Sequence, residues 1–91
     1  MNKAELIQRV SEATGLKKKD ASRAVDAVLS CIRESLSKGQ KVSLVGFGSF
    51  EVRQRSARQG RNPQTGKALR ISARRVPVFR AGRPLKEAVN H

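Results

Sequence analysis

Apolar residues recur at helical spacing over the first fifteen positions of the chain. Asn2 and Glu5 have the spacing of an N-cap residue and of the acid at the third helical position. Gly15 can adopt the left-handed conformation that commonly ends a helix. The pattern therefore predicts a first helix of about three turns. The apolar face of this helix consists of Leu6, Ile7, Val10 and Ala13.

The same spacing continues in a second and longer segment. Asp20 suits the first turn of a helix, where the macrodipole favours an acid, and Lys38 with Gly39 suits the end of one. Two helices joined by a short link predict an N-terminal helical hairpin. The apolar face of the second helix consists of Ala21, Val25, Val28, Leu29, Ile32 and Leu36.

The hydrophobic period changes from helical to alternating after residue 40. Val42 and Leu44 flank a serine, and Phe50 and Val52 flank a glutamate, which is the alternation typical of strands. The glycine-rich residues 46–48 between them predict a tight turn. We therefore expect two antiparallel strands at this point.

The second strand is expected to continue as one limb of a long hairpin arm. The limb runs to about Gly60, "NPQTG" forms the turn, and the chain returns from Lys67 to Phe79. The arm tip, about residues 53–75, has few apolar side chains and cannot bury itself. A limb of ten residues reaches roughly 30 Å from the body.

A short helix is predicted at the end of the chain. Pro84 follows Arg83 at the expected helix start, where the missing N–H of proline would be unpaired in any case. Together the elements predict one α+β domain, whose antiparallel β-sheet carries an extended β-ribbon arm. The single domain of residues 1–91 comprises a helical body (1–40), the sheet and arm (41–80, with the tip at about 53–75) and a C-terminal helix (83–90).

The apolar inventory outside the arm tip is small. About sixty residues remain there, a size at which one chain forms a marginal core. We infer that the core is shared between two chains, while a monomer with a small intramolecular core stays open as the alternative. The aromatic candidates for a shared dimer core are Phe47, Phe50 and Phe79, the only aromatic residues of the chain.

Positive charge is concentrated in the second half of the chain. The formal net charge is +13; residues 1–40 hold eight cations and five acids, whereas residues 41–91 hold twelve cations and two acids. A charge of this size argues for a polyanionic partner, either nucleic acid or an anionic membrane surface. Residues 52–75 contain eight cations and no acid, so the arm is the expected contact surface.

The sequence offers little for catalysis, for a cofactor or for a metal. His91 is the single histidine and stands last, and Cys31 is the single cysteine, expected as a small buried thiol beside the apolar face of the second helix. "GRNPQTGK" and "GFGSFE" fail the spacing of phosphate-binding loops. We expect no catalytic residue, no cofactor and no metal ligand, and an enzyme is the least favoured class.

The sequence indicates a cytoplasmic protein. No apolar run approaches the length that spans a bilayer, and the N-terminus lacks the features of a signal peptide. One cysteine cannot form an intrachain disulfide, which fits a reducing compartment.

Two further features allow more than one interpretation. The run of lysines at 17–19 is either a solvated charge run or a contact to a nucleic-acid backbone. Pro63 is either a residue that presets the backbone of the turn or, if the arm lies in a minor groove, a wedge between base pairs.

Four motifs resemble the bacterial histone-like HU/IHF family of DNA-binding proteins: "MNKAELI", "LVGFGSFEV", "GRNPQTGK" and "VPVFRAGRPLKEAVN". The resemblance runs from Met1 to Asn90, and most of it leans to HU. It implies an intertwined dimer whose two arms enter the DNA minor groove. Such nucleoid-associated proteins bend and condense the bacterial chromosome with little sequence specificity. The expected partner is double-stranded DNA, especially bent, nicked or gapped, with a homodimer favoured and a heterodimer open.

Carried over by position, the resemblance implies Pro63 as the intercalating residue. It departs from the common pattern at Lys17, where Ser or Thr usually caps the second helix, and at Arg83-Pro84, where Lys-Ala is common. Arg74-Arg75 resembles IHF-like members. The expected DNA-binding residues are Lys3, Lys18, Arg53, Arg55, Arg58, Arg61, Asn62, Pro63, Lys67, Arg70, Arg74, Arg75, Arg80 and Arg83.

Two alternative functions stay open. One is an IHF-type subunit that prefers particular sequences, and the other is a general module for RNA or other polyanions. The sequence lacks the aromatic strip and the GXXG loop of common RNA-binding modules, which weighs against the second.

Overall fold

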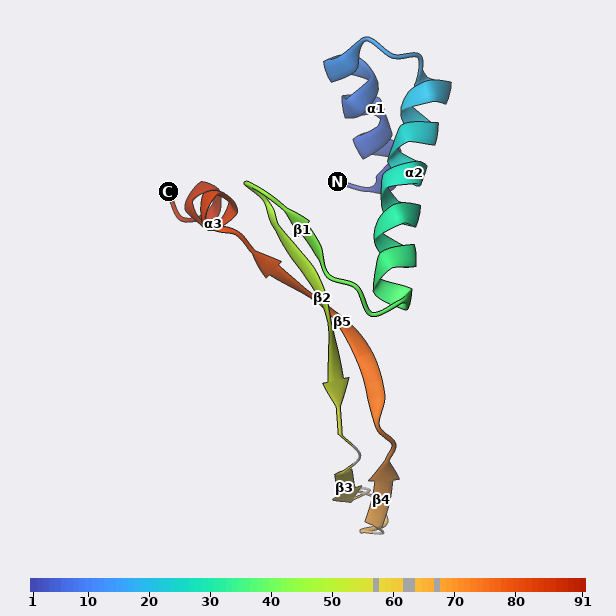
Figure 1. The fold of residues 1–91 in the computed structure, drawn as a ribbon, viewed down its shortest axis with the longest axis vertical. Helices are drawn as coiled ribbons and strands as arrows, with labels where there is room; N and C mark the ends of the chain where they lie inside the picture. Colours follow the sequence, from blue (N-terminus) through green and yellow to red (C-terminus); the bar gives the residue numbers. More distant parts are fainter. Residues whose placement is uncertain (57, 62–63, 67) are drawn as a thin grey trace. The chain divides into compact units, whose positions relative to one another are not determined.

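The computed structural model describes residues 1–56, 58–61, 64–66 and 68–91 (Figure 1). The chain divides into two compact units, Met1–Glu34 and Ser35–His91. Helices and strands are both present, so the predicted α+β class is confirmed. In order the elements are α1 (Lys3–Thr14), α2 (Lys18–Ser37), β1 (Val42–Leu44), β2 (Gly48–Arg55), β3 (Arg58–Arg61), β4 (Ala68–Ile71), β5 (Arg74–Ala81) and α3 (Arg83–Val89).

Local hydrogen bonds fix both ends of α1. The Asn2 side chain accepts a hydrogen bond from the backbone N–H of Glu5 at 2.9 Å. Gly15 has φ 75°, and its N–H donates to the carbonyl oxygen of Ser11 at 2.9 Å. The predicted first helix and both of its caps are confirmed. The caps could be predicted from the sequence because each depends on residues within one turn of the helix.

The end of α2 is a Schellman motif. The N–H of Gly39 donates to the carbonyl of Leu36, and the N–H of Gln40 donates to the carbonyl of Ser35, both at 2.9 Å. Gly39 has φ 76°, a left-handed conformation that glycine adopts without strain. The predicted stop at Lys38 and Gly39 is confirmed.

The apolar face of α2 is only partly covered. Ala21 and Val25 are the buried hydrophobic residues in the described part of the chain, whereas Val28 is 57% exposed. Cys31 is exposed, so the expected buried thiol is wrong for the single chain. The physical reason is length: α2 has 20 residues and α1 has 12, so α1 cannot cover the whole of α2.

A three-stranded antiparallel sheet has the order β1-β2-β5. The turn between β1 and β2 is closed by a hydrogen bond from the N–H of Phe47 to the carbonyl of Leu44 at 3.0 Å. Gly46 has φ 86° at the third position of this turn, which is the type II geometry that requires glycine. The two predicted strands and their tight turn are confirmed. β5 is an edge strand of this sheet and carries Pro77.

The inner end of the sheet is closely packed around Gly48. A Cβ atom on Gly48 would lie 2.6 Å from the carbonyl oxygen of Arg80 and 2.6 Å from the ring of Phe79. The Phe79 ring packs against Phe50 and Phe47, with centroid separations of 4.9 and 5.4 Å. The side chain of residue 48 must therefore be absent for these rings to meet the backbone.

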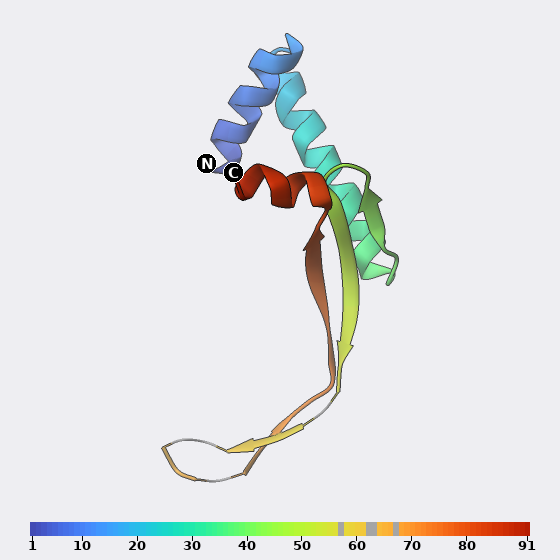
Figure 2. The same cartoon turned by 90° about the vertical axis from the view of Figure 1, so that its left-hand side faces the viewer.

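The arm consists of two separate ladders. β2 pairs with β5 as far as Arg55 and Arg74, and β3 then pairs with β4 in a two-stranded sheet of its own (Figure 2). Ser56 on one limb and Ser72 with Ala73 on the other lie outside these strands. The predicted arm is present, but its limbs are not the single continuous strands that were expected.

Helix α3 follows β5 directly. Gly82 is its N-cap residue and Pro84 lies in its first turn, as predicted. The N–H of Gly82 donates to the carbonyl of Phe47 at 2.8 Å, which joins the start of α3 to the turn before β2. The helix ends at Val89, one residue before the expected end.

Candidate nucleic-acid interface

The pairing of β2 with β5 sorts their residues onto two faces. Residues directly opposite one another in an antiparallel pair lie on the same face, and the faces alternate along each strand. One face carries the pairs Phe50↔Phe79, Val52↔Pro77 and Gln54↔Arg75. The other face carries Ser49↔Arg80, Glu51↔Val78, Arg53↔Val76 and Arg55↔Arg74.

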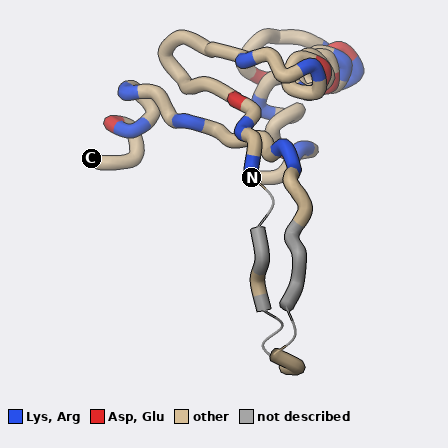
Figure 3. Tube along the Cα trace, turned by 60° about the horizontal axis from the view of Figure 1, so that its bottom comes forward, with Lys and Arg blue, Asp and Glu red and all other residues tan. Residues whose placement is uncertain are grey.

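The second of these faces gathers cations where the arm begins; we call it the cationic face. Arg53, Arg55 and Arg74 are exposed, and Figure 3 shows Lys or Arg positions on both limbs at this point. Arg55 and Arg74 are direct partners in the ladder, and like charges in that position repel one another. A bound anion such as a phosphate would relieve this repulsion, so the arrangement favours a polyanion on this face.

Glu51 places one acid on the cationic face. Its carboxylate lies 3.4 Å from Nζ of Lys41 and 3.9 Å from Nη1 of Arg80, and its side chain is 21% exposed. Arg80 is one of the expected DNA-binding residues, whereas Lys41 is not among them. The missing signal was the register, because Val42 pairs with Phe50 and the residues before and after them are therefore neighbours.

Two of the expected DNA-binding residues are paired with acids of their own chain. Nζ of Lys3 lies 2.6 Å from Oδ1 of Asp26, and Nε of Arg83 lies 3.1 Å from Oε1 of Glu87. Both pairs are well exposed, and such pairs contribute about 0–1 kcal/mol. A phosphate can therefore replace either carboxylate at small cost.

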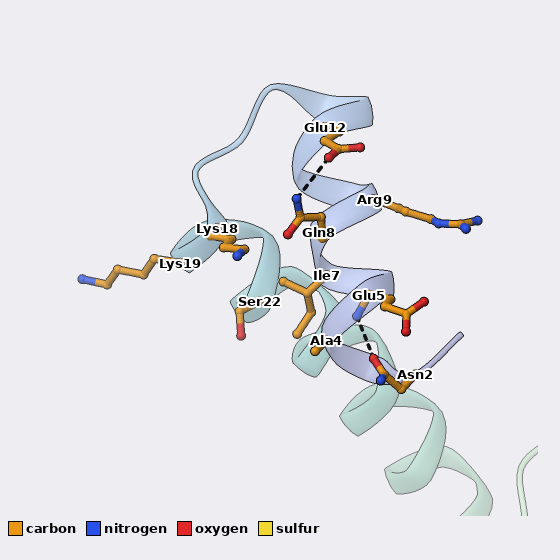
Figure 4. A pocket seen from close by; sticks show the side chains of 10 residues that line it. All are labelled: Asn2, Ala4, Glu5, Ile7, Gln8, Arg9, Glu12, Lys18, Lys19 and Ser22. Carbon is orange, nitrogen blue, oxygen red and sulfur yellow. Dashed lines mark hydrogen bonds between the residues drawn. The ribbon is translucent and has the colours of Figure 1, made fainter.

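Lys18 lines an open groove between α1 and the start of α2 (Figure 4). Lys19 and Arg9 also belong to this groove, and in Figure 4 their side chains extend away from it on opposite sides. Glu5 and Glu12 contribute acids to the same groove. The mixed charge gives this groove less attraction for polyanions than the cationic face has.

The outer arm residues are placed through the backbone alone. Arg58 pairs with Ile71, Arg70 with Gln59, and Arg61 with Ala68. The expected residues Asn62, Pro63 and Lys67 lie outside the described residues. Gln64 and Thr65 form a turn and Gly66 has φ 69°, which agrees with a turn in "NPQTG".

Arg75 does not share the cationic face. It stands opposite Gln54, and its guanidinium approaches Gly39 at the end of α2. Among the expected site residues in the described part of the chain, Arg53, Arg55, Arg74 and Arg80 are the ones that the ladder brings to one face.

The aromatic cluster is partly open in the single chain. Phe47 is 47% exposed and Phe79 is 40% exposed. Leu6, Val10, Val25 and Leu29 line a separate hollow of entirely apolar character in the helical hairpin. Apolar surfaces of this kind on a small basic protein mark an interface.

The described residues carry neither of two other kinds of feature. They contain no helix that is both long and apolar enough to cross a membrane. They also contain no group of three or more His, Cys, Asp and Glu side chains placed to hold a metal ion.

The chain is similar to known DNA-binding proteins along its whole length. The family model "Bacterial DNA-binding protein" matches residues 1–90. DNA-binding protein HU of Geobacillus stearothermophilus is 61% identical over 89 residues, which cover 98% of this chain and 99% of that protein.

Solved structures show the same likeness. The Anabaena HU–DNA cocrystal structure has a TM-score of 0.92 at 50% identity and covers 98% of this chain and 97% of that chain. HU from Thermotoga maritima has a TM-score of 0.71 at 43% identity and covers 98% of both chains. Both structures are of proteins named HU, and the Anabaena protein was crystallised in complex with DNA.

Proposed function

Because the chain belongs to the family of bacterial DNA-binding proteins, we propose that it is an architectural protein of the HU type. It binds duplex DNA with little sequence specificity, bends it and condenses the chromosome in the bacterial nucleoid. The observation that carries the proposal is the cationic face at the root of the arm. Arg53, Arg55 and Arg74 are exposed there without a carboxylate directly opposite them in the ladder.

The contact with DNA is mainly electrostatic. Each arginine or lysine that neutralises a phosphate releases a condensed counterion, which makes affinity fall steeply with salt. In the proposed complex the arm lies in the minor groove and Pro63 inserts between base pairs. The unstacking cost is a few kcal/mol and is offset by the phosphate contacts that bent DNA offers the rest of the protein.

The proposed DNA-binding residues include the cationic face and continue from it onto the body and onto the outer arm. The body contributes through cations that exchange an acid for a phosphate, as Lys3 and Arg83 can do. The outer arm contributes through its own cations. The proposed set is Lys3, Lys18, Arg53, Arg55, Arg58, Arg61, Asn62, Pro63, Lys67, Arg70, Arg74, Arg80 and Arg83, with Lys41 added beside Arg80.

The functional unit is an intertwined dimer. Support comes from the exposed apolar surfaces: Phe47 in the turn before β2, Phe79 in β5, and Val28 and Leu29 on α2. Burying them against a second copy removes apolar area from water, at about 25 cal/mol per Å². Sedimentation equilibrium at micromolar protein tests this step, and a folded monomer that persists on dilution would contradict it.

Competition binding tests the proposed function. The protein is titrated against an intact duplex, a nicked duplex and a duplex RNA of equal length, in a series of salt concentrations. We expect a slope of log K against log salt on the order of −5 to −10 and the tightest binding to nicked DNA, because part of the deformation cost is absent. A slope near −1, or equal affinity for RNA and intact DNA, would overturn it.

Energy transfer between the ends of a short labelled duplex separates bending from association. Pro63→Ala is expected to reduce bending more than affinity and to narrow the preference for nicked DNA. Equal bend angles in the two proteins would leave Pro63 as a turn residue. A large affinity difference between unrelated duplexes of equal flexibility would favour the IHF-type function instead.

A further inference from the structure

The side chain of Arg75 lies beside the loop that ends α2. A Cβ atom on Gly39 would lie 2.8 Å from Nη2 of Arg75 and 3.9 Å from its Cζ. The guanidinium therefore occupies the space that a side chain at residue 39 would need. Gly39 also has φ 76°, a conformation that glycine adopts without strain and that ends the helix, and its lack of a side chain leaves room for the guanidinium.

The end of α2 is a favourable place for a cation. Its last carbonyls carry a partial negative charge, and its last turn contains no basic residue. Two of these carbonyls, those of Ser35 and Leu36, accept hydrogen bonds in the Schellman motif. Lys38 follows the last helical residue, and the side chain of Arg75 brings a further positive charge to this end from β5.

Arg75 also stands where the ladder of the body gives way to the arm. The pairing of β2 with β5 ends one residue further out, at Arg55 and Arg74. Neighbouring residues of a strand point to opposite faces, so Arg74 belongs to the cationic face and Arg75 to the other. The two adjacent arginines thus have different surroundings at the same distance along the arm.

We propose that Arg75 is an arm-positioning residue, which holds the root of the arm against the end of α2 and does not bind phosphate. This revises the DNA-binding role that the sequence implied for it. The contact fixes the direction in which the outer ladder leaves the sheet, and so the bend that the arm imposes on DNA. The consequence for bending rests on the proposed function, whereas the contact itself does not.

Amide hydrogen exchange in the protein without DNA tests the contact. Arg75→Gln is compared with Arg74→Gln, a matched loss of one exposed arginine in the same strand. We expect exchange at the amides of Gly39 and Gln40 to become about two- to five-fold faster in Arg75→Gln and to stay unchanged in Arg74→Gln. Arg75→Lys, which keeps the charge, should retain most of the protection.

Salt titration and end-to-end energy transfer with the same variants test the positioning role. In Arg74→Gln the slope of log K against log salt is expected to fall in magnitude by about one. In Arg75→Gln the slope is expected to stay as in the unsubstituted protein, while the bend becomes smaller and more variable. Unchanged exchange, an unchanged bend, or a slope loss of about one in Arg75→Gln would each overturn the proposal. Failure of the unsubstituted protein to bind DNA would instead overturn the proposed function, and the exchange experiment would still decide whether Arg75 holds the helix end.

Discussion

The inner and outer halves of the β2–β5 ladder share one backbone pattern and have opposite surroundings. The inner half joins Gly48–Val52 to residues 77–81, and there the Phe79 ring touches Phe50 and closes on Gly48. The outer half joins residues 53–55 to residues 74–76, and the arginine side chains of this half are exposed to solvent. The change from packing to exposed charge occurs within one pair of strands.

The contrast shows how a small protein can support an arm that has no core of its own. Backbone hydrogen bonds continue outward from a packed end, so the outer pairs need little side-chain packing to keep their register. The side chains of the outer half are then available for a partner. Substitutions in the inner half should therefore change stability, and substitutions in the outer half should change DNA binding.

The largest effect is expected for Phe79→Ala. Removal of this ring leaves a cavity between Phe47 and Phe50, and we expect the free energy of unfolding of the dimer to fall by about 3–5 kcal/mol. Denaturant unfolding monitored by circular dichroism measures it. Arg74→Gln serves as the outer control, with a change of less than about 0.5 kcal/mol. A loss below about 1 kcal/mol for Phe79→Ala would place the ring at the surface, and the inner half of the ladder would then be no better packed than the outer half.

Gly48→Ala should have a somewhat smaller effect. The new methyl group would lie 2.6 Å from both the Arg80 carbonyl oxygen and the Phe79 ring, and such overpacking typically costs about 1–3 kcal/mol. The same unfolding experiment measures it, with Ser43→Ala on the exposed part of β1 as the control. Equal stability of the two variants would mean that the inner half can shift to admit a side chain.

Arg55→Gln should leave stability unchanged and weaken DNA binding. Loss of one phosphate contact is expected to reduce the magnitude of the salt slope by about one. Fluorescence anisotropy on a labelled duplex at several salt concentrations measures the slope. Arg33→Gln, an exposed arginine of α2, is the matched control and should keep the full slope. The same slope in both variants would remove Arg55 from the interface.

The smallest effect is expected for Glu51→Gln, which should tighten DNA binding about two- to five-fold. The carboxylate forms ion pairs with Lys41 and Arg80 in the free chain, and DNA phosphates must compete with these pairs. Loss of such partly exposed ion pairs changes the free energy of binding by about 0.2–1 kcal/mol. Glu12→Gln removes an equal charge from a residue that accepts a hydrogen bond from Gln8. If DNA affinity rises by the same factor in both variants, the effect of Glu51→Gln comes from the change in net charge and not from the release of Lys41 and Arg80.

Elements fixed by local chemistry could be predicted from the sequence. The cap at Asn2, the stops at Gly15 and Gly39 and the turn at Gly46 each depend on a residue type that acts within a few positions. The strand alternation around Phe50 likewise followed from period alone. The interruption at Ser56 and Ser72 could not be predicted, because neither proline nor glycine stands there to mark it.

The concentration of positive charge in the arm could be predicted from the sequence, but its distribution over the two faces of the ladder could not. Positive charge along the arm is visible in the sequence, whereas the face that each arginine joins depends on the register between β2 and β5. The nearness of Lys41 to Arg80 and the opposite faces of Arg74 and Arg75 could not be predicted for this reason. Cys31 was assigned to the interior because helical period shows which residues share a face but not how far the neighbouring helix reaches.

The position of Pro77 on the edge strand β5 has a consequence for solubility. A proline fits a ladder where its nitrogen points away from the neighbouring strand, so the donor that it lacks is missing from the outer edge of the sheet. Arg74, Arg75 and Arg80 add charge along the same strand. An edge that lacks a donor and repels its own copies is a poor template for a further strand. We therefore expect that copies bound side by side on one DNA molecule do not join through this edge of the sheet.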